Sequence, residues 1–492
     1  MKYDIAEPKP GSLIESLRSV GYNLSTAIAD ILDNSIAARA KNVWLDFRWA
    51  GDKSHISICD DGCGMLEDQL VEAMRPGSRS PLEHRDPSDL GRFGLGLKTA
   101  SFSQCRKLTV LSKAEGADIA SRIWDLDYVS THNEWRLLRD AGEEARPLLD
   151  RLSAMETGTI VHWSQLDRIT CGENTGDTVA HARFNTAIDQ VRNHLAMTFH
   201  RHIEDGSVII HINDHAIAPW NPFLEHHTAT YRTPQEAIRF GNSTIYFRGY
   251  VLPHKDMLSE EEFKIAAGPH GWVAHQGFYV YRSRRLLVPG DWLHLGRPSQ
   301  WTKQEHCNLA RIRLDLPNET DAEWHLDVKK STARPPPIIR DRLSELAESV
   351  RARARSVFAH RGRYGTRIPA VEDFVRPWET VTRDGHTAYR INRQHPAVKS
   401  VFEHLGESSP ELDSLLRVLE ETVPVQQIWL DMAEQTRDPA PPFDGVDFAL
   451  LRADIRRAFD FLVSAGIGAV TARAQLASIE PYNHFPQLLA EL

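Results

Sequence analysis

Two glycine-rich turns near the N-terminus constrain this chain more than any other feature. The first runs from Asp60 to Met65 and reads DDGCGM, and the second runs from Gly91 to Lys98 and reads GRFGLGLK. Glycines let backbone N–H groups approach a phosphate without interference from a Cβ atom. A helix that begins at such a turn adds a favourable dipole for an anion. The two turns therefore predict a site for a phosphorylated ligand.

A third element precedes both turns. Ser25 can cap a helix whose apolar residues recur at helical spacing, and this helix carries Asp30 and Asn34. A carboxylate and an amide four residues apart lie on one helix face and can point at one ligand. The amide oxygen of Asn34 is a hard ligand of the kind that suits Mg²⁺ beside phosphates. Taken alone, the pair could be surface polar residues; with both turns downstream, it predicts a site for a nucleoside triphosphate and a divalent metal.

The composition limits the class of protein. A chain of 492 residues is too long for one hydrophobic core, so we expect two to four domains. A net charge of −9 argues against a protein that coats nucleic acid with its whole surface, although it allows a local basic patch. The five cysteines lack paired spacing, which favours a reducing cytosol without disulfides or a zinc site. No long apolar run and no secretory leader are present, so we expect a cytoplasmic protein without a membrane span.

The order of elements predicts an α/β fold. Alternating apolar residues over 43–49 and 56–58 predict two strands after the helix, and further strands are expected near 108–111, 123–124 and 159–163. Helix on strands in this order is typical of a two-layer α/β sandwich. The polar, proline-containing segment between the two glycine turns is expected to act as a lid.

A second group of strands is expected farther along the chain. Candidate strands lie at 208–212, 278–281 and 311–316, and Pro335 to Pro337 mark a boundary beyond which the pattern is mostly helical. The first of these strands is expected to open the second domain. The sequence therefore predicts two α/β domains followed by a helical domain.

The order of these motifs resembles that of the GHKL, or Bergerat-fold, ATPases, a family that includes Hsp90, MutL, type II topoisomerase subunits, MORC proteins and histidine kinases. The stretch GRFGLGLKTAS, from Gly91 to Ser101, is most similar to MORC-type and related bacterial Hsp90-like ATPases. The resemblance implies an α/β architecture: a two-layer Bergerat ATP-binding sandwich over residues 1–190 and a ribosomal S5-like transducer domain over 191–337. A mainly helical C-terminal domain over 338–492, of unknown role, would follow.

The resemblance also implies roles for individual residues. Asp30 occupies the position of the family's catalytic carboxylate, which orients or deprotonates the attacking water. Most members that hydrolyse ATP have glutamate there, so the shorter aspartate implies slow hydrolysis, and Asp33 is the next candidate base. Asp60 takes the place of the aspartate that accepts from the adenine amino group. Lys330, with Lys329 as the alternate, would reach the γ-phosphate and report its presence.

The ligand set follows from the same resemblance, with ATP and Mg²⁺ as cofactors and Asn34 as the metal ligand. The residues implied in ATP binding are Asn34, Asp60, Gly62, Gly64, Met65, Gly91, Gly94, Leu95, Gly96, Leu97, Lys98 and Thr159. The spacing from Gly91 to Gly96 also suggests a dinucleotide fold. That fold requires a preceding strand in a βαβ unit and a distant acidic residue, and the chain offers neither at the right place.

The implied function is an ATP-dependent conformational switch. It would dimerise on ATP binding and act on DNA or a DNA-processing complex, with bacterial anti-phage defence as one setting. The arginine-rich segment 334–367 suits contact with a phosphate backbone, but it could equally be a solvated helix face. Two alternatives stay open: a chaperone-like ATPase that acts on protein clients, and a nucleotide-gated scaffold with little hydrolysis.

Overall fold

The computed structural model divides the chain into two units, Met1–Gly362 and Arg363–Leu492, each considered by itself. The residues that the structure describes are 4, 8–19, 21–77, 96–140, 142–170, 174–241, 243–317, 320, 323–324, 333–359, 377–383, 386–395, 398–399, 401–402, 409–425, 447–464, 466–477, 482 and 485–492.

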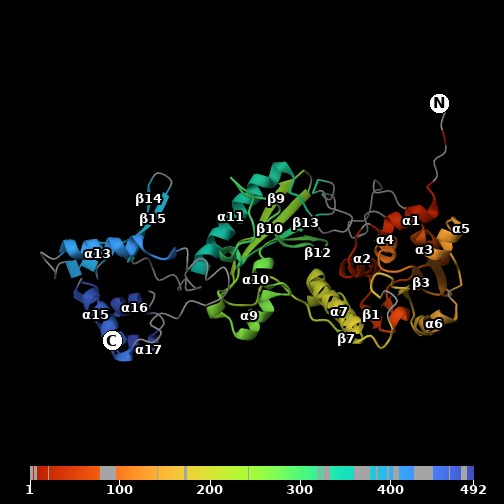
Figure 1. The fold of residues 1–492 in the computed structure, drawn as a ribbon, viewed down its shortest axis with the longest axis horizontal. Helices are drawn as coiled ribbons and strands as arrows, with labels where there is room; N and C mark the ends of the chain where they lie inside the picture. Colours follow the sequence, from red (N-terminus) through yellow and green to blue (C-terminus); the bar gives the residue numbers. More distant parts are fainter. Residues whose placement is uncertain are drawn as a thin grey trace. The chain divides into compact units, whose positions relative to one another are not determined.

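A seven-stranded sheet, to which the strands labelled β1, β3 and β7 in Figure 1 belong, organises the N-terminal part of the first unit. The strand order is β4-β3-β5-β2-β1-β6-β7. Its strands are β1 (Asn42–Arg48), β2 (His55–Asp60), β3 (Lys107–Lys113), β4 (Ala120–Asp125), β5 (Gly158–Ser164), β6 (Ile209–Ile212) and β7 (His215–Ala216). All neighbours pair antiparallel except β1 and β6, which are parallel. The strand expected to open the second domain is therefore part of the first sheet.

Helices cover this sheet. They are α1 (Pro10–Arg18), α2 (Leu24–Ala37), α3 (Glu67–Met74), α4 (Gly96–Phe102), α5 (Leu126–His132), α6 (Arg146–Ser153), α7 (Thr178–Thr198) and α8 (His200–Glu204). Alternate residues of the central strands enter a large core with α2, α4 and α7. The opposite face carries a smaller core around Cys59, Leu111, Leu152 and Ile160, with α6. This arrangement confirms the predicted α/β sandwich.

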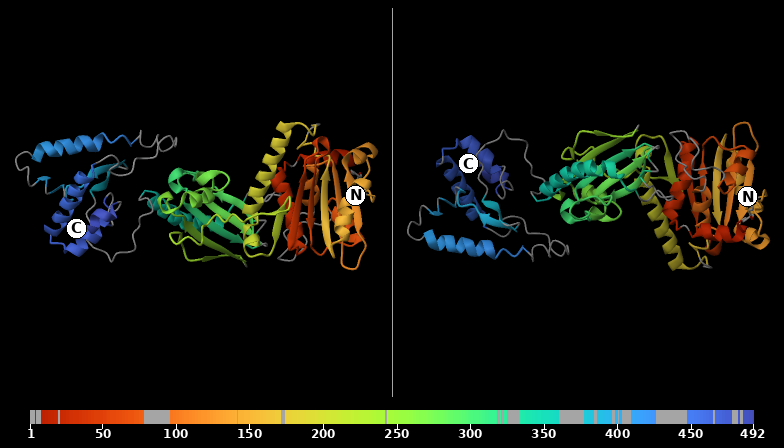
Figure 2. Two further views of the ribbon diagram at one scale, coloured as in Figure 1. Left: turned by 90° about the horizontal axis from the view of Figure 1, so that it is seen from below. Right: turned by 90° about the horizontal axis from the view of Figure 1, so that it is seen from above.

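The helix α2 begins two residues earlier than the sequence predicts. Its N-cap is Asn23, whose side chain accepts a hydrogen bond from the Thr26 backbone N–H at 2.8 Å. Ser25 lies inside the first turn, so the predicted cap is wrong. Asparagine is at least as good a cap as serine, and here it stands three residues before a free N–H group. The long helix α7, yellow in Figure 2, packs against α2. The expected domain boundary at residue 190 falls inside α7.

A second sheet has the order β12-β11-β13-β10-β8, with β9 paired to β10. Its strands are β8 (Tyr231–Arg232), β9 (Glu236–Phe240), β10 (Ser243–Val251), β11 (Gly277–Arg282), β12 (Arg285–Asp291) and β13 (Ala310–Leu316). The short helices α9 (Glu260–Ala267) and α10 (Gly271–Ala274) lie between β10 and β11 in the sequence. The end of α7 contributes Met197 to a cluster with Tyr250, Tyr279 and Tyr281, so this helix contacts both sheets.

The long helix α11 (Pro337–Ala359) packs against β10 and β13 (Figure 1). It buries five apolar residues at spacings of three and four, namely Ile339, Leu343, Ala347, Val350 and Ala354. At the crossing, a Cβ atom on Gly249 of β10 would lie 2.3 Å from Val350 Cγ2. Only glycine permits this close approach. The helix from residue 338 therefore packs on the strands that precede it.

Arg351 of α11 is not part of a basic surface. Its side chain is almost fully buried, and its guanidinium lies 5.0 Å and 4.3 Å from the ring centroids of Trp292 and Trp301. It also forms an ion pair with Glu348 at 2.8 Å. Neither interpretation of the arginine-rich segment holds for this residue, because the indole rings exclude it from both solvent and a phosphate backbone.

The second unit contains the hairpin β14 (Trp378–Arg383) and β15 (His386–Ile391). The helices described there are α13 (Ser409–Glu421), α15 (Phe448–Ser464), α16 (Ala469–Ala477) and α17 (Pro486–Ala490). Leu451, Ile455 and Phe459 of α15 pack with Leu476 and Leu488 in a small core. Among the residues that the structure describes in either unit, no helix is long and apolar enough to cross a bilayer.

We expect the Arg351→Ala variant to lose about 1–3 kcal/mol of unfolding free energy, because it loses two cation–π contacts and leaves Glu348 with one partner fewer. Urea unfolding followed by circular dichroism measures the change. The matched control is Arg342→Ala on the same helix, since Arg342 is half exposed and pairs with the surface residues Glu236 and Glu345. That variant should lose about 0–1 kcal/mol. Equal losses in the two variants would contradict the buried role of Arg351.

Candidate functional site

The centre of the candidate site is α2, which is buried on nearly every side between Ala27 and Asp33. The Asp30 side chain is 4% exposed and accepts a hydrogen bond from the Tyr22 hydroxyl at 2.8 Å through Oδ2. Its other oxygen, Oδ1, accepts from Arg285 Nη2 at 3.2 Å. The carboxylate predicted to be catalytic is therefore held by one residue before α2 and one from the second sheet.

Asp33 and Asn34 follow on the next turn of α2. Asp33 is 2% exposed and forms an ion pair with Arg285 Nε at 2.7 Å. Asn34, in contrast, is exposed. Its amide oxygen is open to a ligand one turn beyond Asp30, and an oxygen donor of this kind is compatible with Mg²⁺ shared with phosphates. The described residues contain no cluster of three or more His, Cys, Asp or Glu that would form a metal site by themselves.

A second group of contacts surrounds Asp60, at the end of β2. Ser35 of α2 donates its hydroxyl to Asp60 Oδ2 at 2.8 Å, and the Gly62 backbone N–H donates to Oδ1 at 3.0 Å. Burial raises the pKa of Asp60 to about 6, although both hydrogen bonds oppose this rise. The Thr159 backbone contributes a third hydrogen bond. A carboxylate offers about four lone-pair sites, so Asp60 retains the capacity to accept from a ligand.

The first glycine turn has a fixed conformation. Gly64 has a φ of +64°, and a Cβ atom there would lie 2.0 Å from the Lys113 carbonyl oxygen. The next residue, Met65, donates its backbone N–H to Ser112 Oγ at 2.9 Å, and Ser112 Oγ lies 2.8 Å from Thr159 Oγ1. Thr159 stands directly opposite Asp60 in the sheet register. The structure thus brings the predicted residues Asp60, Gly64, Met65 and Thr159 together.

The second glycine turn is described only from Gly96 onward. Gly91, Gly94 and Leu95 lie outside the described residues, as do Lys329 and Lys330. Gly96 begins α4, and Leu97 is half-buried at its start. Lys98 is almost fully buried and donates to the carbonyl oxygen of Ala73, at the end of α3, at 2.9 Å. The side chain of Lys98 therefore links α4 to α3, a helix that lies inside the segment predicted to be a lid.

Sequence reasoning missed four residues of this arrangement: Tyr22, Ser35, Ser112 and Arg285. Ser35 follows Asn34 directly, so its position one residue beyond the helical motif was the one available signal. Arg285 lies 255 residues from Asp30 in the chain, and no local pattern could connect the two.

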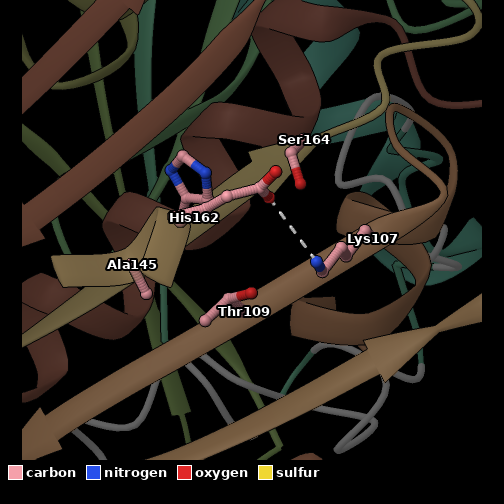
Figure 3. Close-up of a pocket in the computed structure, with 6 residues that line it drawn as sticks. Lys107, Thr109, Ala145, His162 and Ser164 are labelled. Atoms are coloured by element: carbon pink, nitrogen blue, oxygen red, sulfur yellow. Dashed lines mark ion pairs between the residues drawn. The ribbon is translucent and has the colours of Figure 1, made fainter. Parts of the chain in front are cut away.

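The opposite face of the sheet carries a small polar pocket of about 10 Å³, enough for one water molecule (Figure 3). Its lining residues are Lys107, Thr109, Glu144, Ala145, His162 and Ser164. Lys107 and Glu144 form an ion pair at 3.8 Å, and His162 Nδ1 lies 2.9 Å from Ser57 Oγ. Burial lowers the pKa of His162 to about 4, so this ring is neutral at pH near 7. The pocket is too small for a nucleotide.

Comparison with known proteins identifies the family that this part of the chain resembles. Residues 22–159 match the family model described as histidine kinase-, DNA gyrase B-, and HSP90-like ATPase. The chain is 30% identical to ATPase morc-1 of Caenorhabditis elegans over 91 residues, which are 18% of this chain and 10% of that relative. It is 31% identical to the DNA mismatch repair protein MutL of Buchnera aphidicola over 102 residues, which are 20% of this chain and 17% of that relative.

A second MutL, from Paramagnetospirillum magneticum, is 27% identical over 125 residues, which are 25% of this chain and 18% of the relative. The matched part of the chain thus spans less than a fifth of the length of each of these relatives. All three matches agree with the predicted resemblance to MORC and MutL proteins. Through residues 22–159, the chain belongs to the GHKL family of histidine kinase-, DNA gyrase B- and HSP90-like ATPases.

Proposed function

We propose that the protein is an ATP-dependent conformational switch that binds ATP and Mg²⁺ at α2, the Asp60 turn and the start of α4, and that hydrolyses ATP slowly. The observation that carries the proposal is the state of Asp60. This carboxylate is buried at the end of a strand, is held by Ser35 and Gly62, and lies opposite Thr159. A buried carboxylate is costly, so its presence inside a family-matched domain supports a ligand-binding role.

Asp60 would select adenine over guanine as the base of the bound nucleotide. Adenine presents an amino group at the position where guanine presents an oxygen. An ionised carboxylate accepts a hydrogen bond from the adenine amino group and repels the guanine oxygen. The rigid turn at Gly64 fixes the backbone beside Asp60, which reduces the conformational entropy lost on binding.

The chemistry would take place around α2. Asp30 would orient or deprotonate the attacking water, and the exposed amide of Asn34 would hold Mg²⁺, which neutralises phosphate charge when bound. General-base help of this kind contributes roughly 10²–10⁴-fold in rate. One observation favours a second candidate, the nucleotide-gated scaffold with little hydrolysis: both oxygens of Asp30 are already engaged, by Tyr22 and Arg285.

The conformational output is a dimer. Lys330, or alternatively Lys329, would contact the γ-phosphate, so that ATP but not ADP orders the dimeric state. The names of the MutL relatives, DNA mismatch repair proteins, support DNA or a DNA-processing complex as the target, with anti-phage defence as one setting. Since Arg351 is buried, any DNA contact by α11 would use its exposed residues, such as Arg340 and Arg353.

We expect Asp60→Ala to weaken ATP binding by roughly 1.5–3 kcal/mol, because it removes a charge-assisted hydrogen bond. Isothermal titration calorimetry measures the loss. The matched control is Asp52→Ala, since Asp52 is an exposed aspartate in the turn that precedes β2. Unchanged ATP affinity in the Asp60 variant would rule out the adenine assignment.

The pH dependence of ATP binding provides a second test of Asp60. Because burial raises the pKa of Asp60 to about 6, this carboxylate becomes protonated as the pH falls from about 7.5 to about 5. ATP affinity should therefore fall over this interval in the wild type. Asp60→Asn should lose that part of the pH dependence, whereas titration of ATP itself affects both proteins equally.

Hydrolysis should depend on both α2 positions. We expect Asp30→Ala to keep ATP binding and lose roughly 10²-fold or more in kcat, and Asn34→Ala to lose the Mg²⁺-dependent part of binding. Steady-state ATPase assays and calorimetry with and without Mg²⁺ separate the two effects. A faster Asp30→Glu variant would show that the short side chain limits the native rate. Full turnover in Asp30→Ala would reject this base and make Asp33 the candidate.

A nonhydrolysable ATP analogue should shift the protein toward a dimer, and ADP should not, because only the triphosphate offers the group that Lys330 contacts. Light scattering reports the mass in each nucleotide state. Lys330→Ala should bind the analogue and remain in its resting state, and the same behaviour in Lys329→Ala instead would make the alternate lysine the γ-phosphate contact. The same mass with both nucleotides would reject the gated dimer. ATPase stimulation by unfolded protein rather than by DNA would favour the chaperone-like function.

A further inference from the structure

Arg285 connects the second sheet to the carboxylates of α2. It is the first residue of β12, directly after the turn formed by Ser283 and Arg284. Its side chain is only 4% exposed and reaches both Asp30, at 3.2 Å, and Asp33, at 2.7 Å. The guanidinium also lies 5.9 Å from the ring centroid of Phe199, at the end of α7. One side chain therefore bridges two carboxylates on consecutive turns of another element.

This buried contact is unfavourable in free energy unless the guanidinium of Arg285 stays paired with both carboxylates. Burying a charged group is strongly unfavourable when its partner is absent, and breaking a buried pair costs more than breaking a surface pair. The planar guanidinium can donate in two directions from one rigid fork, which suits two carboxylates spaced three residues apart on a helix. A lysine at the same place could satisfy one of them at a time.

The geometry restricts Asp30 in particular. Oδ2 accepts from Tyr22 and Oδ1 accepts from Arg285, so the carboxylate plane is held from two sides. A base must lie within hydrogen-bond reach of the proton that it takes, and a misplacement of about 1 Å can cost 10²-fold in rate. The orientation of Asp30 is thus set in part by the second sheet.

We propose that Arg285 is a positioning residue for ATP hydrolysis, which fixes the Asp30 carboxylate and makes turnover depend on the placement of β12 against α2. This inference rests on the proposed function of Asp30. Arg285 does not contact the nucleotide in this mechanism, so its loss should affect the rate of the chemical step and leave nucleotide affinity nearly unchanged.

The neighbouring arginine provides a matched control. Arg284 belongs to the same turn, and its side chain is 41% exposed. It forms an ion pair with Asp205 and donates to the Arg201 carbonyl oxygen at 2.7 Å, both in or next to α8. Arg284 therefore anchors the same hairpin through partners at α8, and its removal tests whether any loss at this turn has the same effect.

The experiment compares kcat, KM and the calorimetric Kd for a nonhydrolysable ATP analogue in the wild type, Arg285→Ala, Arg285→Lys and Arg284→Ala. We expect Arg285→Ala to lower kcat by about tenfold or more with Kd changed less than about threefold. Arg285→Lys should recover part of kcat, because an ammonium can still pair with Asp30. Arg284→Ala should keep the wild-type kcat. Thermal unfolding of each variant identifies any that fails to fold, in which case Arg285→Lys carries the comparison.

A double variant tests whether Arg285 acts through Asp30. If it does, adding Arg285→Ala to Asp30→Ala should lower the residual kcat no further, as the two changes remove one unit. Wild-type kcat in both Arg285 variants would overturn the inference. A loss of nucleotide affinity as large as the loss of kcat would also overturn it, and so would an equal loss of kcat in Arg284→Ala. Wild-type protein that binds ATP without any hydrolysis would overturn it as well. Absence of ATP binding in the wild type would instead overturn the proposed function.

Discussion

The burial of α2 on nearly all sides is the constraint on which the candidate site depends. Ile28, Ile31 and Leu32 enter the large core, as a helix packed on a sheet requires. Three polar residues of the same helix, Asp30, Asp33 and Ser35, are equally buried. A buried polar group without a partner costs about 1–3 kcal/mol, and a buried charge costs more. Each of the three must therefore be met by a group from elsewhere in the fold.

Those partners come from three different places. Tyr22 precedes α2, Asp60 ends the central strand β2, and Arg285 begins a strand of the second sheet. The need to satisfy one helix thus draws the turn before it, the sheet beneath it and the neighbouring sheet to one region. Asp60 itself has a raised pKa because it is buried, and this cost of keeping a carboxylate at the end of β2 supports the proposed role in which Asp60 accepts a hydrogen bond from a ligand.

The second sheet shows how tertiary packing changes the meaning of a charge pattern. Arginines are dense around α11, and in sequence they suggest either a surface for phosphate or a solvated helix face. In the structure, Arg351 lies against two tryptophan rings and Arg285 lies against two aspartates. Both side chains are buried in the interior of the protein. A guanidinium can be buried in this way when aromatic faces or carboxylates surround it. Arg342, by contrast, remains a half-exposed surface residue.

The sequence by itself determined the local parts of the site. The turn at Gly62 and Gly64, the helix with Asp30 and Asn34, the α/β sandwich and the family were all predictable, because turn geometry and helical spacing depend on residues close together in the chain. Only the tertiary structure decided that Asn23 caps α2, that β6 pairs with β1, that Ser35 holds Asp60 and that Arg285 holds Asp30. The last contact joins residues 255 positions apart, and its existence depends on how two sheets pack around α7, which no local pattern encodes.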